Sequence, residues 1–313
     1  MKHIKLMALL LAVGLTACSS DDEVERGLLP EDSSNLKQRP LFSDDSQAQR
    51  LIIVEVEETP MTDTSAPEEE KMETRATATT TSTLAAFSMN CQGNKDNKYD
   101  FTKTGTEWSS FYWPGSVEND ERIDFYAYTG GTFNYNSDNP YLTFTVAEDA
   151  SNQHDLLVAE HKQIAYNDAG GRVSLSFNHA CAAIQFKIGQ SQTLANKSVT
   201  FKSITLVGVY NSGKYYYNQT PAWQVQEQSG DAYYTLEDAT SIEVPFSTKT
   251  HDGARWLDCG CLFMIPQAHS NAIIRIGYNT NKTADISLGP INWEAGKLYT
   301  ISIRLGTNTI VTE

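Results

Sequence analysis

The sequence predicts an all-β protein with two β-sandwich domains in tandem, preceded by an export signal and a long polar segment. Short runs of Val, Ile, Thr and aromatic residues favour strands, and the chain holds 15 Tyr, 12 Phe and 5 Trp. Gly, Pro, Asn and Asp interrupt these runs at short intervals, while a helical period is scarcely visible. The roughly 230 residues that carry this pattern suit two sandwiches better than one.

Residues 1–17 predict a signal peptide, and Cys18 predicts a site of lipidation. Lys2 and Lys5 precede an apolar stretch, and small residues lead directly into Cys18. This looks like a bacterial lipoprotein signal, although an ordinary secretory signal with a chance cysteine is the alternative. Acyl chains on Cys18 would hold the protein at a membrane, because each buried CH₂ contributes about 0.8 kcal/mol. The acidic residues 19–23 resemble a surface-export tag of Bacteroidetes lipoproteins, or form a plain spacer.

Residues 18–75 predict an acidic tether, or propeptide, that contains one strand. The chain has 24 Lys and Arg against 39 Asp and Glu, a net charge of −15, which argues against nucleic-acid binding. Within the tether, residues 51–57 have strand composition, and Ile52, Val54 and Val56 share one face. Residues 59–83 again have linker composition. The isolated strand must therefore find its sheet elsewhere in the chain.

The remaining strands divide into two sets, with the boundary expected in the turn at residues 167–171. The first sandwich (76–168) is expected to hold strands at 84–90, 123–128, 141–146 and 155–159. The second (169–313) is expected to hold strands at 173–177, 183–188, 199–209, 215–217, 241–245, 261–265, 272–278 and 298–305.

We predict that the protein is not an enzyme and that it holds no metal ion and no cofactor. The sequence contains none of the common nucleophile, zinc-protease, phosphate-loop or dinucleotide motifs, and its Cys and His lack metal-ligand spacing. The cysteines after Cys18 are interpreted as mostly buried small hydrophobes. His179 is interpreted as a hydrogen-bonded histidine at a strand bend rather than a catalyst.

Aromatic clusters offer a different function. Residues 108–113 and 215–217 are rich in Trp and Tyr, and exposed rings can stack on sugars. Consecutive aromatic residues on a strand face opposite ways, however, so at least half of them would be core. A monomeric surface lipoprotein that binds glycans or host ligands through Trp108 and Trp113 is therefore kept as the alternative hypothesis.

An ordered set of short motifs resembles the fimbrillin (FimA-like and Mfa-like) proteins of Bacteroidetes. The motifs lie at residues 108–114, 123–128, 155–159, 177–180, 263–267 and 293–299. The resemblance implies two transthyretin-like Greek-key sandwiches and a structural or tip subunit of a type V pilus. It also implies export to the outer membrane and the cell surface, removal of the first strand by an arginine-specific protease, and polymerisation with other subunits into a fimbrium by strand exchange.

Under this resemblance Arg75 is the expected cleavage residue. Cutting at Arg26 or Arg50 would leave the first strand in place, and Arg39 precedes Pro40. A linker arginine with no role is the alternative. Removing Ile52, Val54 and Val56 would cost about 5 to 9 kcal/mol of burial and would open a sheet edge to an incoming strand.

The incoming strand has one candidate in this sequence. Thr309, Ile310 and Val311 lie near the C-terminal end and have strand composition. They form either a donor strand for another subunit or a simple final strand.

Overall fold

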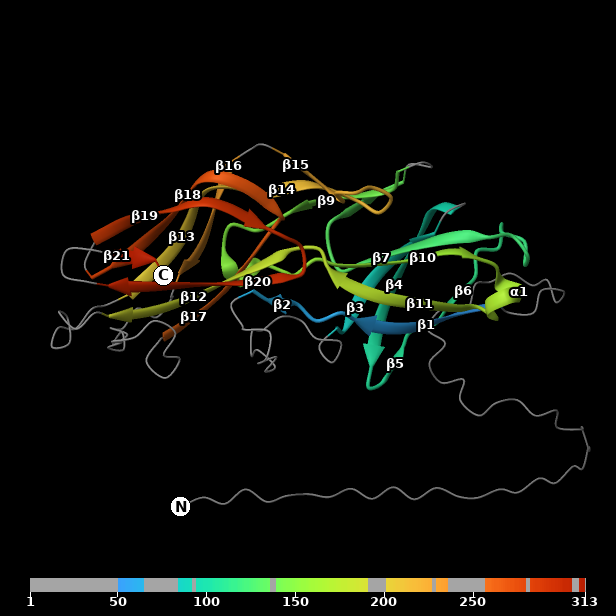
Figure 1. Cartoon of the computed structure of the whole chain (residues 1–313). Helices are drawn as coiled ribbons and strands as arrows, with labels where there is room; N and C mark the ends of the chain where they lie inside the picture. Colours follow the sequence, from blue (N-terminus) through green and yellow to red (C-terminus); the bar gives the residue numbers. More distant parts are fainter. Residues whose placement is uncertain are drawn as a thin grey trace, which may run out of the picture. The chain divides into compact units, whose positions relative to one another are not determined.

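The computed structural model describes residues 50–64, 84–91, 94–135, 139–190, 201–226, 229–235, 257–279, 282–305 and 310–312 (Figure 1). Strands account for nearly all of the regular structure in these ranges, which confirms the all-β prediction. The exceptions are the 3-10 turn η1 (Ala150–Asn152) and the single-turn helix α1 (Tyr166–Ala169). No helix in the described ranges is long and apolar enough to cross a membrane.

Eight strands form one sheet in the order β5-β4-β3-β7-β10-β11-β1-β6. Their bounds are β1 (Leu51–Glu58), β3 (Ala86–Cys91), β4 (Asn94–Thr104), β5 (Glu107–Trp108), β6 (Phe111–Tyr112), β7 (Ile123–Tyr128), β10 (Leu157–Ile164) and β11 (Arg172–His179). The sheet curls round on itself, since Phe111 of β6, at one end, packs edge-on against Phe101 of β4, one strand from the other end, with ring centroids 4.8 Å apart. It thereby encloses a first cluster of buried side chains that includes Ile52, Phe125 and Phe177.

Two further sheets face each other across a second cluster. One has the order β17-β12-β20-β2, with β21 also paired to β20, and the other has the order β16-β13-β18-β19. Their bounds are β2 (Thr62–Asp63), β12 (Ala182–Gln190), β13 (Phe201–Tyr210), β16 (Ser229–Thr235), β17 (Leu257–Met264), β18 (Gln267–Tyr278), β19 (Lys282–Trp293), β20 (Lys297–Leu305) and β21 (Ile310–Thr312). Phe186 of β12 and Ile274 of β18 belong to the cluster between them, so this part of the chain is a β-sandwich.

A fourth sheet has the order β15-β14-β9-β8. Its strands are β8 (Thr132–Asn134), β9 (Tyr141–Thr145), β14 (Ser212–Tyr216) and β15 (Trp223–Val225). The sequence grouped residues 141–146 with the first sandwich, yet Leu142 and Phe144 of β9 belong to the second cluster, because β9 pairs with β14. The described residues thus hold two separate clusters, while the division into two sandwich domains and its limits stay a prediction.

Most other predicted strands exist within a few residues of their expected bounds, and the one at 241–245 lies outside the described residues. Two long strands, β4 and β19, were missed. In its second half β4 alternates buried Tyr99 and Phe101 with polar residues, while its first half is wholly polar. β19 is an edge strand that contains Gly289, with φ +67°, and Pro290. Such residues resemble a turn in the sequence and are tolerated at a sheet edge.

Candidate functional site: the first strand and its groove

The predicted strand at residues 51–57 is confirmed as β1, and it is paired on both sides. Its register with the parallel neighbour β11 runs from Ile53 opposite Arg172 to Glu58 opposite Phe177. Against β6 it is antiparallel, with Leu51 opposite Tyr112. Figure 1 shows β1 in blue beside β11. The segment that the sequence isolates between two linkers is therefore an internal strand of the eight-stranded sheet.

Burial along β1 follows the predicted face but is uneven. Ile52 is 1% exposed and belongs to the first cluster, whereas Val54 and Val56 are partly buried against it. Ile53, on the opposite face, is 46% exposed. All three share the predicted face, but the estimate of about 5 to 9 kcal/mol assumed full burial of each, which only Ile52 reaches. Ile52 makes the main contribution, because burying one such side chain fully contributes about 1.5 to 3 kcal/mol.

The start of β1 is fixed by backbone contacts. Ile53 N–H donates to Gly171 O at 2.9 Å, and Gly171 has φ +79°. A Cβ placed on Gly171 would lie 2.1 Å from Leu51 O, so only glycine lets β1 approach this closely.

Arg50 holds the chain just before β1. It donates through Nη1 to Val117 O at 2.8 Å and through Nη2 to Pro114 O at 3.1 Å. Its guanidinium also lies over the ring of Tyr166, 5.8 Å from the centroid. These contacts would make Arg50 a poor protease target, a reason separate from its position before the strand, on which the sequence set it aside.

The end of β1 carries a buried cluster of three ionisable side chains. His179 Nδ1 lies 2.5 Å from Asp155 Oδ2, and His179 Nε2 lies 3.4 Å from Glu58 Oε1. The side chains of His179, Asp155 and Glu58 are 1%, 0% and 2% exposed. Glu58 Oε2, Asp155 Oδ1 and His179 Nε2 form no hydrogen bond in the described structure. The interpretation of His179 as a hydrogen-bonded histidine is confirmed, while its two carboxyl partners were not anticipated.

Burial raises the pKa of the Glu58 carboxyl from its ordinary value of 4.5 to about 7. His179 opposes this shift and Asp155 adds to it, and these are the charged groups that act on Glu58. In a free strand the pKa of Glu58 would have its ordinary value of 4.5. At a pH between this value and about 7, docking of β1 therefore takes up a proton. The contribution of Glu58 to docking is therefore most favourable below pH 4.5, weakens as the pH rises, and levels off above pH 7.

This linkage gives a testable pH dependence. We expect hydrogen-exchange protection of the β1 amides, corrected for intrinsic exchange rates, to fall by about tenfold or more from pH 5 to pH 8. A Glu58→Gln variant, which cannot titrate, should lose most of this trend. Protection that is equally pH-dependent in both proteins would contradict the assignment to Glu58.

After β1 the chain continues onto a second sheet. Thr62 N–H donates to Gly296 O at 2.8 Å and Thr64 N–H to Leu298 O at 3.0 Å, so β2 lies on the edge of β20. The same edge of β20 holds β21 further along, with Ile310 opposite Leu305 and Val311 opposite Arg304. Removal of the segment before Arg75 would thus free two sheet edges, one on β11 and one on β20.

The other predicted site residues divide into those outside and those inside the described part. Cys18, Arg75 and Thr309 lie outside it, so lipidation and cleavage are not tested. Ile310 and Val311 form part of β21, a final strand in this structure. Cys91 and Cys181 are buried, as interpreted, while Cys261 is only partly buried.

Of the two tryptophans named in the glycan hypothesis, one is buried and the other is partly buried. Trp113 is 3% exposed and packs edge-on against Phe125, with centroids 5.2 Å apart. Trp108 is partly buried, with its ring 4.9 Å from that of Phe87 and Lys103 over it. Trp113 is therefore a core residue, in line with the expectation that at least half of these aromatic residues are core, and the alternative hypothesis loses it as a sugar-binding residue.

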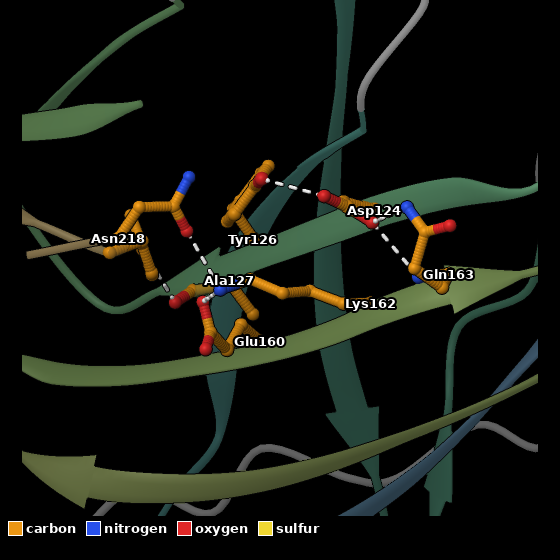
Figure 2. Close-up of polar contacts among 8 residues, drawn as sticks. Asp124, Tyr126, Ala127, Glu160, Lys162, Gln163 and Asn218 are labelled. Carbon is orange, nitrogen blue, oxygen red and sulfur yellow. Dashed lines mark hydrogen bonds and ion pairs between the residues drawn. The ribbon is translucent and has the colours of Figure 1, made fainter. Parts of the chain in front are cut away.

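A pocket outside the groove of β1 is lined by both polar and aromatic side chains. It has a volume of about 260 Å³ and is lined by Val158, Ala159, Glu160, Ser176, Asn178, Tyr215 and Tyr217. Figure 2 shows the neighbouring polar groups paired with one another: Lys162 Nζ lies 2.9 Å from Glu160 and 2.7 Å from Asn218 Oδ1. These groups already satisfy each other, and the pocket therefore gives no firm support for a ligand site.

Comparison with known proteins identifies the family. The family model described as fimbrillin-like matches residues 59–313, and thus begins directly after β1. The chain belongs to the fimbrillin-like family. No curated protein matches it significantly.

A solved structure shares the fold of this fimbrillin-like chain. A protein of Bacteroides ovatus assigned to cell adhesion has a TM-score of 0.55 and 14% identity, over 85% of this chain and 97% of that one. A fimbrial protein of Bacteroides vulgatus has a TM-score of 0.47 and 16% identity, over 85% of this chain and 98% of that one. At these identities the first of the two shows a common fold alone.

Proposed function

We propose that this fimbrillin-like protein is a structural or tip subunit of a cell-surface pilus, exported as a lipoprotein through Cys18 and assembled by strand exchange after cleavage at Arg75. The observation that supports strand exchange best is the placement of β1. It lies upstream of Arg75 in the sequence, yet it is an internal strand with Ile52 in the first cluster. Its removal would uncover the edge of β11 and an apolar groove. An unpaired edge of this kind is a template for a strand from another subunit.

This function makes the protein a structural and adhesive component rather than an enzyme. Its partners are other pilus subunits, the outer membrane before processing, and an arginine-specific protease. The protein would lie at the cell surface, as part of the fimbrium. A host or glycan ligand would be bound if it is a tip subunit, at the end of the filament. The alternative of a monomeric glycan-binding lipoprotein is weakened by the burial of Trp113.

Cleavage provides the test. An arginine-specific protease should convert the purified full-length chain to a stable product that begins at Ala76, followed over time by oligomers. An Arg75→Lys variant should resist this cut, because the charge remains but the recognised side chain does not. The matched control Arg39→Lys should behave as the unmodified chain does. Cuts scattered through the sandwiches, or equal cleavage of the Arg75→Lys chain, would contradict the proposal.

A further inference from the structure

The inward face of β1 ends on a charged residue rather than an apolar one. Ile52, Val54, Val56 and Glu58 alternate along the strand, and Glu58 continues the face that packs against the first cluster. Its side chain is nonetheless only 2% exposed and meets His179 at the end of β11. Burying an acid is costly unless a polar group meets it, so the groups around Glu58 decide whether the groove favours an acid here.

His179 and Asp155 belong to the body of the protein and remain when β1 leaves. Asp155 Oδ2 and His179 Nδ1 lie 2.5 Å apart, so Asp155 orients the imidazole and directs Nε2 at the strand in the groove. Nε2 forms no hydrogen bond and lies 3.4 Å from Glu58 Oε1, an ion-pair distance but long for a hydrogen bond. If the strand in the groove carried an apolar side chain at this position, the buried Nε2 would lose the carboxyl oxygen that lies nearest to it.

A single proton in the contact between His179 and Glu58 can be carried by either side chain. With the Asp155 bond on Nδ1, a protonated Glu58 can donate to Nε2, or a charged imidazole can donate to the Glu58 carboxylate. Both arrangements hold the same number of protons and the same total charge. A glutamine amide can also donate to Nε2, whereas leucine offers neither a donor nor an acceptor.

We propose that the buried His179–Asp155 pair is a recognition subsite of the groove, which selects a strand carrying a carboxyl or carboxamide side chain at the register of Glu58. The subsite thus accepts Glu58 in the precursor. In the assembled state it would accept a strand of another subunit with apolar residues at alternate positions and Glu, Asp or Gln at the next inward position. The identity of this partner rests on the proposed strand exchange, but the contact with Glu58 does not.

The first experiment uses the uncleaved full-length chain. Hydrogen exchange of the β1 amides is compared at pH 6 in the unmodified chain and in the Glu58→Gln, Glu58→Leu and Glu57→Leu variants. Glu57 is an exposed residue of the same strand and provides the matched control. We expect Glu58→Leu to lower protection at least tenfold, Glu58→Gln to stay within about threefold of the unmodified chain, and Glu57→Leu to have no effect.

An unchanged protection of β1 in the Glu58→Leu variant would overturn the proposal. Apolar replacements of buried ionic groups are often neutral or stabilising. If Glu58→Leu protects β1 as well as Glu57→Leu does, the groove has no polar requirement and the subsite proposal is overturned. Because no cleavage is involved, this result is independent of whether Arg75 is processed.

The second experiment addresses the partner. After cleavage at Arg75, a labelled synthetic peptide of residues 50–64 should bind the processed chain at least tenfold more tightly than its Glu58→Leu version. Equal binding of the two peptides would overturn selection by the subsite. Failure of cleavage to release the strand would instead count against strand exchange, with the first experiment still deciding the subsite.

Discussion

A Gly171→Ala substitution should displace the start of β1 from its groove. The added Cβ would lie 2.1 Å from Leu51 O, a backbone atom that cannot move unless β1 moves. Gly171 also has φ +79°, where an L side chain costs about 1 to 2 kcal/mol. We expect β1 amide protection to fall more than tenfold and the free energy of unfolding to fall by about 2 kcal/mol or more.

Gly170 provides the matched control for this prediction. It also has a positive φ, of +58°, but an added Cβ would meet nothing within 4 Å. Gly170→Ala should therefore cost only the backbone strain, about 1 to 2 kcal/mol, and should leave β1 protected. Equal effects of the two substitutions on β1 exchange would show that strain in the turn, rather than contact with Leu51, determines the result.

An Ile52→Ala substitution should destabilise the protein by about 2 to 5 kcal/mol, as measured by denaturant unfolding. Ile52 is 1% exposed and belongs to the first cluster, so the truncation would leave a cavity among buried side chains. The neighbouring Ile53 has the same side chain on the same strand but is 46% exposed. Ile53→Ala should therefore change the stability by roughly 0.5 kcal/mol or less.

The pair of isoleucines also tests the role of β1 in the precursor. If the two substitutions had similar small effects, β1 would contribute little to the first cluster, and its removal would not create a groove that favours an incoming strand. A large difference would instead support the view that the precursor is completed by a segment proposed to be lost.

The contacts of Glu58 connect the pH and recognition experiments. The carboxyl is buried against His179, and its pKa is raised to about 7, so the precursor would hold β1 more tightly in mildly acidic conditions. A subunit strand with Gln at this register would be held without the pH dependence. Comparison of Glu58→Gln with the unmodified chain therefore separates the need for a polar partner from the need for a titrating one.

Much of the secondary structure could be predicted from the sequence, because local composition and periodicity record it. The run Ile52, Val54, Val56 predicts a strand and its inward face, and β7 begins and ends at the predicted residues. The strand β4 was missed because its first half is wholly polar, and its pairing with β3 and β5 is not recorded in its local sequence. The grouping of β9 failed for a related reason, since strand order depends on pairing rather than on proximity in sequence.

Contacts between distant residues could not be read from the sequence. Glu58 lies one residue beyond the predicted strand at 51–57, and nothing local indicated that His179 and Asp155 would meet it. Gly171 was expected in a turn, and its function in admitting β1 depends on a carbonyl 120 residues earlier in the chain. Alternation along a strand favoured the core for at least half of the clustered aromatic residues but could not say which, and the contacts with Phe125 and Tyr166 place Trp113 among them.

The sequence by itself determined that this chain is all-β, that a lone strand precedes a long linker, and that the ordered motifs resemble fimbrillins. These features are local, since side-chain alternation and turn residues act over a few positions. Only the tertiary structure decided which edge the lone strand occupies, how deeply each of its residues is buried, and which buried pair receives its last inward side chain. Those outcomes depend on packing between residues far apart in the chain, where burial and hydrogen bonding are set by the whole fold.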